Sequence, residues 1–139
     1  EEQAEAGRHA GPSISCDISV PVSRVPNFLE RSYQELHEIL PSAVVNGFGH
    51  VGDGNIHFSV RKPADLGEQQ WEQYKGPLMD QLLDLIVEFE GSFSAEHGIG
   101  SDKRTMLADY AGGPRLDVMK LIKQALDPKG LMNPGKVFL

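Results

Sequence analysis

The chain has a single cysteine, no long apolar run and no block of basic residues, and each shortage excludes a class of protein. Cys16 is the only cysteine among 139 residues, so no disulfide forms within the chain and a reducing compartment, the cytoplasm, is expected. No apolar run approaches the roughly 20 residues that a membrane-spanning helix needs. The net charge of -7, without clustered Lys or Arg, argues against nucleic acid or an anionic membrane as the main partner. We therefore expect a soluble domain with a small-molecule ligand.

The beginning of the chain indicates a piece of a longer protein. Glu1 stands where a complete chain would carry methionine, so a targeting signal would be missing from this segment. Residues 1–13 are charged and rich in Ala and Gly without periodicity, which predicts a flexible tail or linker containing a solvated His9.

The apolar periodicity predicts an α+β fold. Strands are expected over 14–20, 43–51, 55–61 and 92–96, and helices over 25–40 and along a stretch that is interrupted at Gly76-Pro77 and capped by Gly91. Trp71 and Tyr74 in that stretch are interpreted as core, although an aromatic cofactor box would also place them together. The order β-α-β-β-α-β is ferredoxin-like, an antiparallel sheet with helices on one face. Two more helices, about 102–110 and 114–126, and a Pro- and Gly-rich tail follow, so residues 14–100 and 101–139 are expected to be distinct parts.

Two of the five histidines flank a turn in the stretch GHVGDGNIH, residues 49–57. Asp53-Gly54 is typical of a two-residue type I′ hairpin loop. In that register His50 faces His57 with Cβ atoms about 5 Å apart, so both imidazoles can bind one cation. A polar cross-strand pair or a satisfied core histidine is the alternative. Asp53 and Asn55 are interpreted as turn residues.

A third metal ligand is expected in SAEHGIGSDK, where Glu96 and His97 end the last expected strand. Two histidines and one carboxylate leave a coordination position open, as a catalytic site requires. Adjacent strand residues point to opposite faces, so only one of the two can reach the metal. Glu96 would then complete the metal site, and His97, on a backbone that Gly98 and Gly100 allow to turn tightly, would act as general base. Taken alone, this pair favours a polar strand end.

Read together, four stretches resemble the C-terminal domain of FAD-linked oxidases, the group of D-lactate dehydrogenase, the glycolate oxidase flavoprotein subunit and D-2-hydroxyglutarate dehydrogenase. They are DISVPVS at 17–23, GHVGDGNIH at 49–57, EHGIGSDK at 96–103 and DPKGLMNPGK at 127–136. The resemblance implies that a separate N-terminal domain of the same chain binds FAD, while this part caps the flavin and supplies the substrate site. An isolated fragment would then be inactive.

The resemblance also implies roles for individual residues. Positions matching His50, His57 and Glu96 bind a divalent metal in relatives, commonly zinc; the position matching His97 is the acid/base residue; and the position matching Asn133 lies close to the flavin. Ser15 and Ser59 stand where relatives of the 2-hydroxyglutarate type carry a lysine and an asparagine linked to the substrate carboxylate. The resemblance therefore does not specify that substrate.

The expected reaction is oxidation of a small D-2-hydroxy acid to the 2-oxo acid, with hydride passing from C2 to the flavin. A metal-dependent hydrolase and a non-catalytic ferredoxin-like ligand-binding module are the alternatives. The sequence lacks the His-Glu-x-x-His helix common in such hydrolases, and the module leaves the converging ligands without a purpose. The substrate, the electron acceptor, the metal and the oligomeric state, for which a homodimer is one option, stay open.

Overall fold

A computed structural model describes residues 11–50, 52–110 and 112–139, and in these ranges the chain forms a three-stranded antiparallel sheet and four α-helices. The predicted α+β class is confirmed. The chain divides into two compact units, residues 1–96 and 97–139. Most of the tail predicted at 1–13, including His9, lies outside the described residues.

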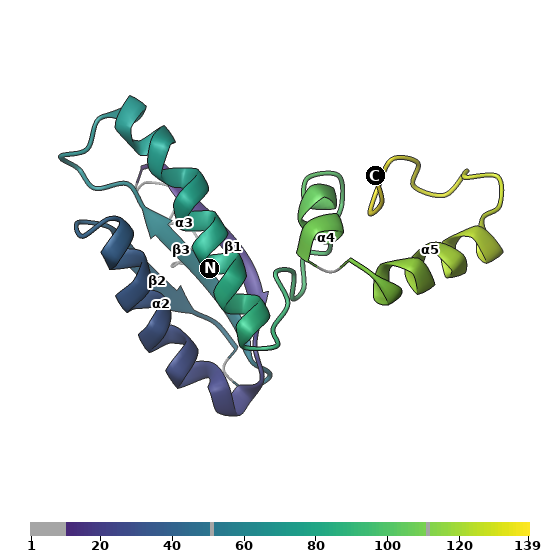
Figure 1. The fold of residues 1–139 in the computed structure, drawn as a ribbon, viewed down its shortest axis with the longest axis horizontal. Coiled ribbons are helices and arrows are strands. Elements are labelled where there is room, and N and C mark those ends of the chain that lie inside the picture. The colour runs from purple at the N-terminus through teal and green to yellow at the C-terminus, as the bar shows by residue number, and fades with distance from the viewer. Residues whose placement is uncertain (1–10, 51, 111) are drawn as a thin grey trace. The chain divides into compact units, whose positions relative to one another are not determined.

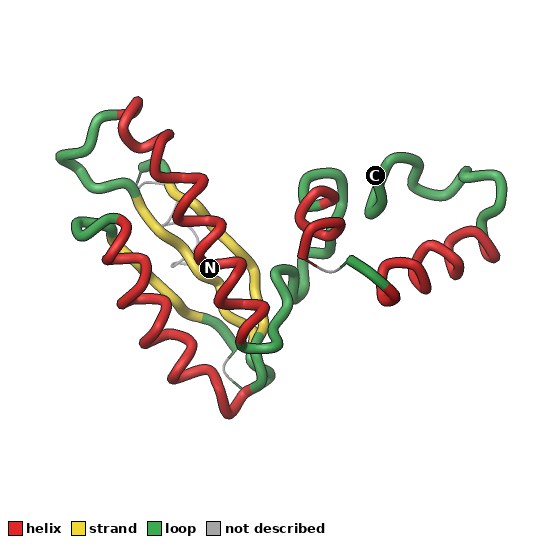
Figure 2. The backbone as a smooth tube through the Cα atoms, in the orientation of Figure 1, coloured by secondary structure: helices red, strands yellow, loops and turns green. Residues whose placement is uncertain are grey.

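The first unit is a sheet with an apolar and a polar face. Its strands are β1 (Ser13–Ser19), β2 (Val44–Phe48) and β3 (Asn55–Arg61), and β3 lies in the centre. Alternation along β1 and β3 buries one set of side chains: Ile14, Ile18, Ile56, Phe58 and Val60. The helices α2 (Val25–Ile39) and α3 (Glu68–Glu88) cover this apolar face, as Figure 1 shows. The helices lie on one face of the strands in Figure 2 as well, as predicted.

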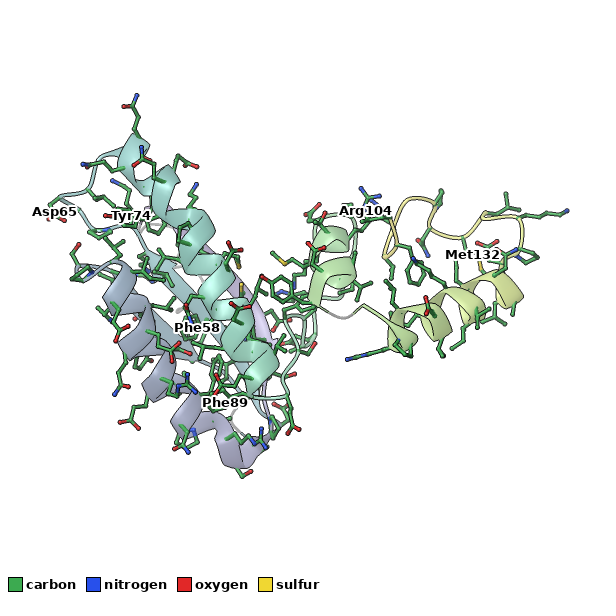
Figure 3. The ribbon with its side chains drawn as sticks, in the orientation of Figure 1. Phe58, Asp65, Tyr74, Phe89, Arg104 and Met132 are labelled. Carbon is green, nitrogen blue, oxygen red and sulfur yellow. The ribbon has the colours of Figure 1, made fainter. Side chains whose placement is uncertain are left out.

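The core between helices and sheet is built from large apolar side chains. Trp71 is fully buried, which confirms its interpretation as a packing residue. Phe28 packs edge-on against Phe58 and Phe89, with ring centroids 6.2 and 5.5 Å apart. Figure 3 labels Phe58 and Phe89 in this layer. The first unit therefore has a hydrophobic core of its own, which fixes the sheet that carries the polar face.

The predicted interruption at Gly76-Pro77 is wrong, because α3 runs without a break from Glu68 to Glu88. Pro77 removes one backbone donor from the helix, but it and Gly76 are exposed, so water can satisfy the carbonyl left over. The buried Trp71 and Leu78 on the other side of the helix hold it against the sheet.

The hairpin forms as predicted, but its loop is longer than two residues. Strand β2 ends at Phe48, and Phe48 rather than His50 is paired with His57. The shift is two residues, so it keeps every side chain on its predicted face. Gly54 lies in the loop and takes no part in the β2–β3 ladder; its carbonyl instead accepts a hydrogen bond from Val20 N–H at 3.1 Å. A contact with Val20, the residue after β1, therefore overrides the local turn preference of Asp53-Gly54.

The predicted fourth strand is reduced to an edge segment beside β1. Ser19 and Ser92 exchange two backbone hydrogen bonds of 2.9 and 2.8 Å, and Ala95 N–H donates to the Asp17 carbonyl at 3.1 Å. Between them the Ser92 hydroxyl bonds the Ser94 backbone and bends the chain, so the ladder is interrupted. The predicted cap is also corrected: Glu90, not Gly91, takes the left-handed conformation after α3, with φ +57°.

The second unit contains α4 (Arg104–Tyr110) and α5 (Pro114–Leu126). The bounds of α5 agree with the prediction, and Pro114 stands in its first turn. In the tail, Asp127 accepts hydrogen bonds from Lys123 Nζ and from the backbone N–H groups of Leu131 and Met132. Among the described residues, which also include the short 3₁₀ turn η1 (Val22–Arg24), no helix is both long and apolar enough to cross a membrane.

Candidate metal centre

Three acidic or imidazole side chains meet on the polar face of the sheet, opposite the face that α2 and α3 cover. Asp17 on β1 and His57 on β3 are directly paired in the ladder, so they share this face. The edge segment beside β1 brings Glu96 to the same place. One possible ligand atom from each of the three residues lies within 4.8 Å of the other two.

The two ring nitrogens of His57 face different carboxylates. Nδ1 lies 3.6 Å from Asp17 Oδ1, and Nε2 lies 3.4 Å from Glu96 Oε1. The other oxygen of Asp17 accepts the backbone N–H of Glu96 at 2.8 Å. The three residues are thus linked into one cluster from three segments of the chain.

The cluster changes from buried to open across its width. The side chain of Asp17 is 3% exposed, that of His57 is 30% exposed, and that of Glu96 is 49% exposed. Two carboxylates beside one imidazole concentrate negative charge, and burial of Asp17 strengthens the field because little water screens it. The exposed fraction therefore rises from Asp17 through His57 to Glu96.

His50 lies beside the cluster but is not one of the three residues whose possible ligand atoms lie within 4.8 Å of one another. Its ring centroid is 6.1 Å from that of His57, and its side chain is exposed. Phe48 is paired with His57 in the ladder, and the centroids of these two rings are 5.5 Å apart. The longer hairpin loop explains this arrangement, because it places His50 beyond the end of β2. Its role as a ligand stays a prediction.

His97 and Asn133 belong to the second unit. His97 is exposed and is followed by Gly98 at φ +72° and Gly100 at φ +57°, so the predicted tight turn is present. Asn133 is exposed and left-handed, with φ +49°, and its carbonyl accepts Lys136 N–H at 3.2 Å. The roles predicted for both residues are not tested by these contacts.

Sequence reasoning missed Asp17 and Asn55 as members of the site. Alternation along 14–20 already points Asp17 away from the core, but its pairing with His57 depends on a contact across 40 positions of sequence, which no local pattern reveals. Asn55 was interpreted as a turn residue, whereas it begins β3, is 7% exposed, and donates from Nδ2 to Glu96 Oε1 at 2.6 Å.

The donor set fits a divalent metal. It offers imidazole nitrogen and carboxylate oxygen without thiolate, which suits zinc in a site with an open position. The ligand atoms come from a rigid ladder and from an edge segment that is hydrogen-bonded to it, so the protein holds them together without a metal. His50 adjoins the cluster as a further nitrogen donor.

Comparison with known proteins identifies relatives along nearly the whole chain. The family described as "FAD linked oxidases, C-terminal domain" matches residues 2–137. The chain is 37% identical over 123 residues to a D-2-hydroxyglutarate dehydrogenase of Stutzerimonas stutzeri, covering 88% of this chain and 26% of that protein. It is 34% identical over 122 residues to a D-lactate dehydrogenase of Anaerostipes hadrus, covering 88% and 25%. It is 37% identical over 135 residues to a probable mitochondrial D-lactate dehydrogenase of Danio rerio, covering 96% and 26%.

The chain thus spans about a quarter of the length of these relatives. The family match, by contrast, covers nearly the whole chain, including both units and all four motif stretches. The chain belongs to the family of C-terminal domains of FAD-linked oxidases.

Proposed function

We propose that this chain is the substrate- and metal-binding part of an FAD-dependent oxidoreductase that oxidises a small D-2-hydroxy acid to the 2-oxo acid. The observation that supports the proposal most is the cluster of Asp17, His57 and Glu96 on the polar face of the sheet. The chain also belongs to the family of C-terminal domains of FAD-linked oxidases. Its relatives are named D-2-hydroxyglutarate and D-lactate dehydrogenases. Family membership favours the oxidoreductase over the hydrolase, and the converged donor atoms disfavour a module without metal chemistry.

The proposed ligands are His50, His57 and Glu96, and the proposed metal is zinc. A divalent metal bound by them would lower the pKa of a substrate hydroxyl and hold the substrate carboxylate. The C2 atom of the substrate would then be oriented for hydride transfer. The exposure of Glu96 supports this assignment, since the substrate must reach the open coordination position from solvent. The site gives no basis for choosing one 2-hydroxy acid.

The remaining chemistry is assigned to the second unit and to a domain outside this chain. His97 is proposed to take the hydroxyl proton as general base, and a bound flavin would supply the acceptor for the hydride from C2, which completes a two-electron oxidation. Asn133 is proposed to form one edge of the flavin pocket. An FAD-binding domain elsewhere in the same polypeptide would provide the rest, in keeping with the relatives, of whose length the chain covers about a quarter.

A pair of variants in the full-length enzyme tests these roles. His97→Asn should leave the metal content unchanged and lower kcat by about 10²–10⁴-fold, the usual contribution of general acid/base catalysis. Glu96→Gln should lose metal and activity together, because a neutral amide is a poor replacement for a carboxylate ligand. Metal analysis and steady-state kinetics on both variants provide the measurement.

The opposite pattern would contradict the proposed roles. If His97→Asn removes the metal while Glu96→Gln keeps both metal and rate, the two residues have exchanged functions.

A cytoplasmic location is also proposed, on the basis of the single cysteine. The Danio rerio relative is named mitochondrial, so cell fractionation is needed to distinguish the two locations.

A further inference from the structure

Asp17 is a buried carboxylate whose two oxygens face two different parts of the candidate metal centre. Its side chain is 3% exposed, although burial of a charged group is unfavourable unless charge or hydrogen bonds compensate. Compensation comes from the site itself, through His57 on one oxygen and the Glu96 backbone on the other. The burial of Asp17 therefore calls for a role within the site.

The first contact distinguishes the two nitrogens of His57. Nδ1 lies on the side of Asp17, whereas Nε2 lies on the side of Glu96. A neutral imidazole carries one proton, and a metal shared by Nε2 and Glu96 would need the lone pair of Nε2, which leaves the proton on Nδ1, facing the buried Asp17 carboxylate. The lone pair of Nε2 then points towards Glu96, the residue proposed to share the metal.

The second contact positions Glu96. Asp17 Oδ2 accepts Glu96 N–H at 2.8 Å, and the Asp17 carbonyl accepts Ala95 N–H at 3.1 Å. Asp17 thus attaches the edge segment to β1 immediately before the Glu96 side chain. With Oδ2 engaged by this N–H and Oδ1 on the side of Nδ1, the Asp17 side chain faces both His57 and the backbone that carries Glu96.

We propose that Asp17 is a positioning residue of the metal site: it selects Nε2 of His57 as the ligand atom and fixes the backbone from which Glu96 reaches the same metal. The inference rests on the metal site proposed above. It assigns that site an outer partner, meaning a residue that contacts the metal ligands without binding the metal itself. Carboxylates in this position orient metal-binding histidines in many proteins, and their loss costs about 10- to 100-fold in metal affinity.

The test uses zinc and the 139-residue chain, because the first unit has its own buried core. Zinc titration should show affinity about 10- to 100-fold weaker in Asp17→Asn than in the unaltered chain. Asp65→Asn, which removes the same charge from an exposed loop (Figure 3), should leave the affinity unchanged. Glu96→Gln, as a ligand variant, should lose more affinity than Asp17→Asn.

Nitrogen-15 NMR of the zinc-loaded, unaltered chain tests the choice of nitrogen without any variant. The expected spectrum shows His57 with its proton on Nδ1 and the metal on Nε2. Metal on Nδ1, or a loss in Asp17→Asn as large as in Glu96→Gln, would make Asp17 a ligand and overturn the inference. An unchanged affinity in Asp17→Asn would overturn it too. Failure of the unaltered chain to bind zinc would contradict the metal site itself.

Discussion

Asn55 connects the turn of the hairpin to the candidate metal centre. Its Nδ2 donates to Glu96 Oε1 at 2.6 Å, and its own backbone N–H donates to Asp53 Oδ1 at 3.0 Å. Asn55→Ala removes the only contact of this side chain with Glu96 that the structure describes, so zinc affinity should fall by about tenfold, the lower end of the range for an outer partner. Calorimetric titration measures the change. Asn46→Ala is the matched control, because it removes an amide from the same face of the sheet, where Asn46 is paired with Ser59, one row from His57. An equal loss of zinc affinity in both variants would contradict a specific role of Asn55.

Asp127 gives the second unit a pH dependence. Its hydrogen bond with Lys123, followed by those from the N–H groups of Met132 and Leu131, lowers the pKa of the carboxyl from 3.8 to about 2. Because the pKa is lower in the folded state, the stabilisation is complete above pH 3.8 and is lost as the pH falls through about 2. The amide resonances of Leu131 and Met132 should titrate with that midpoint and lose the transition in Asp127→Asn. A midpoint near 3.8 would show that these bonds do not form.

At the scale of elements, the hairpin loop depends on a glycine that touches Val20, the residue after β1. A Cβ on Gly54 would lie 2.1 Å from the Val20 carbonyl oxygen, and the residue has φ +79°. Gly54→Ala should therefore destabilise the chain by about 1–3 kcal/mol, the usual range for a strained backbone. Gly52→Ala is the control, since a Cβ there meets nothing within 4 Å. Denaturant unfolding of the two variants measures the difference; equal stabilities would contradict the described packing of Gly54.

The sequence predicts the elements of this fold better than the contacts between them. Helix α5 and strand β3 have their predicted bounds, because apolar periodicity and proline positions are local signals. The hairpin register differs from its prediction by two residues because Gly54 accepts a hydrogen bond from Val20, a residue just after β1 and distant in sequence. The edge segment fails to become a strand because the Ser92 hydroxyl competes for backbone groups, which strand periodicity does not reveal.

The same distinction applies to the candidate site. His57 and Glu96 stand out in the sequence through their residue types and glycine-rich surroundings, and the structure brings them within 3.4 Å. Asp17 lies in a stretch that reads as an ordinary strand, so its place beside His57 emerges only from the pairing of β1 with β3. A sequence pattern thus identifies donors more readily than the groups that orient them.

At the scale of the whole molecule, the chain corresponds to about a quarter of its relatives. The described residues contribute Asn133 as a proposed edge of the flavin pocket, and the sequence contains no glycine-rich phosphate cradle of the kind that binds a dinucleotide. The purified 139-residue chain should therefore be colourless and catalytically inactive, whereas the full-length protein should show the flavin absorbance band. Ultraviolet-visible spectroscopy of the two proteins is sufficient. A yellow 139-residue chain would contradict this division of labour.

The most direct test of the proposed function is anaerobic reduction of the flavin in the full-length enzyme, followed by stopped-flow absorbance. D-2-hydroxy acids of different chain length should bleach the flavin and their L enantiomers should not. Removal of metal by a chelator should slow the bleaching by at least about 10²-fold, since Lewis-acid activation of the hydroxyl is then lost. Zinc should restore the rate in the unaltered enzyme but not in Glu96→Gln. Bleaching by a D-2-hydroxy acid at an unchanged rate in the metal-free enzyme would contradict a metal centre in the reaction.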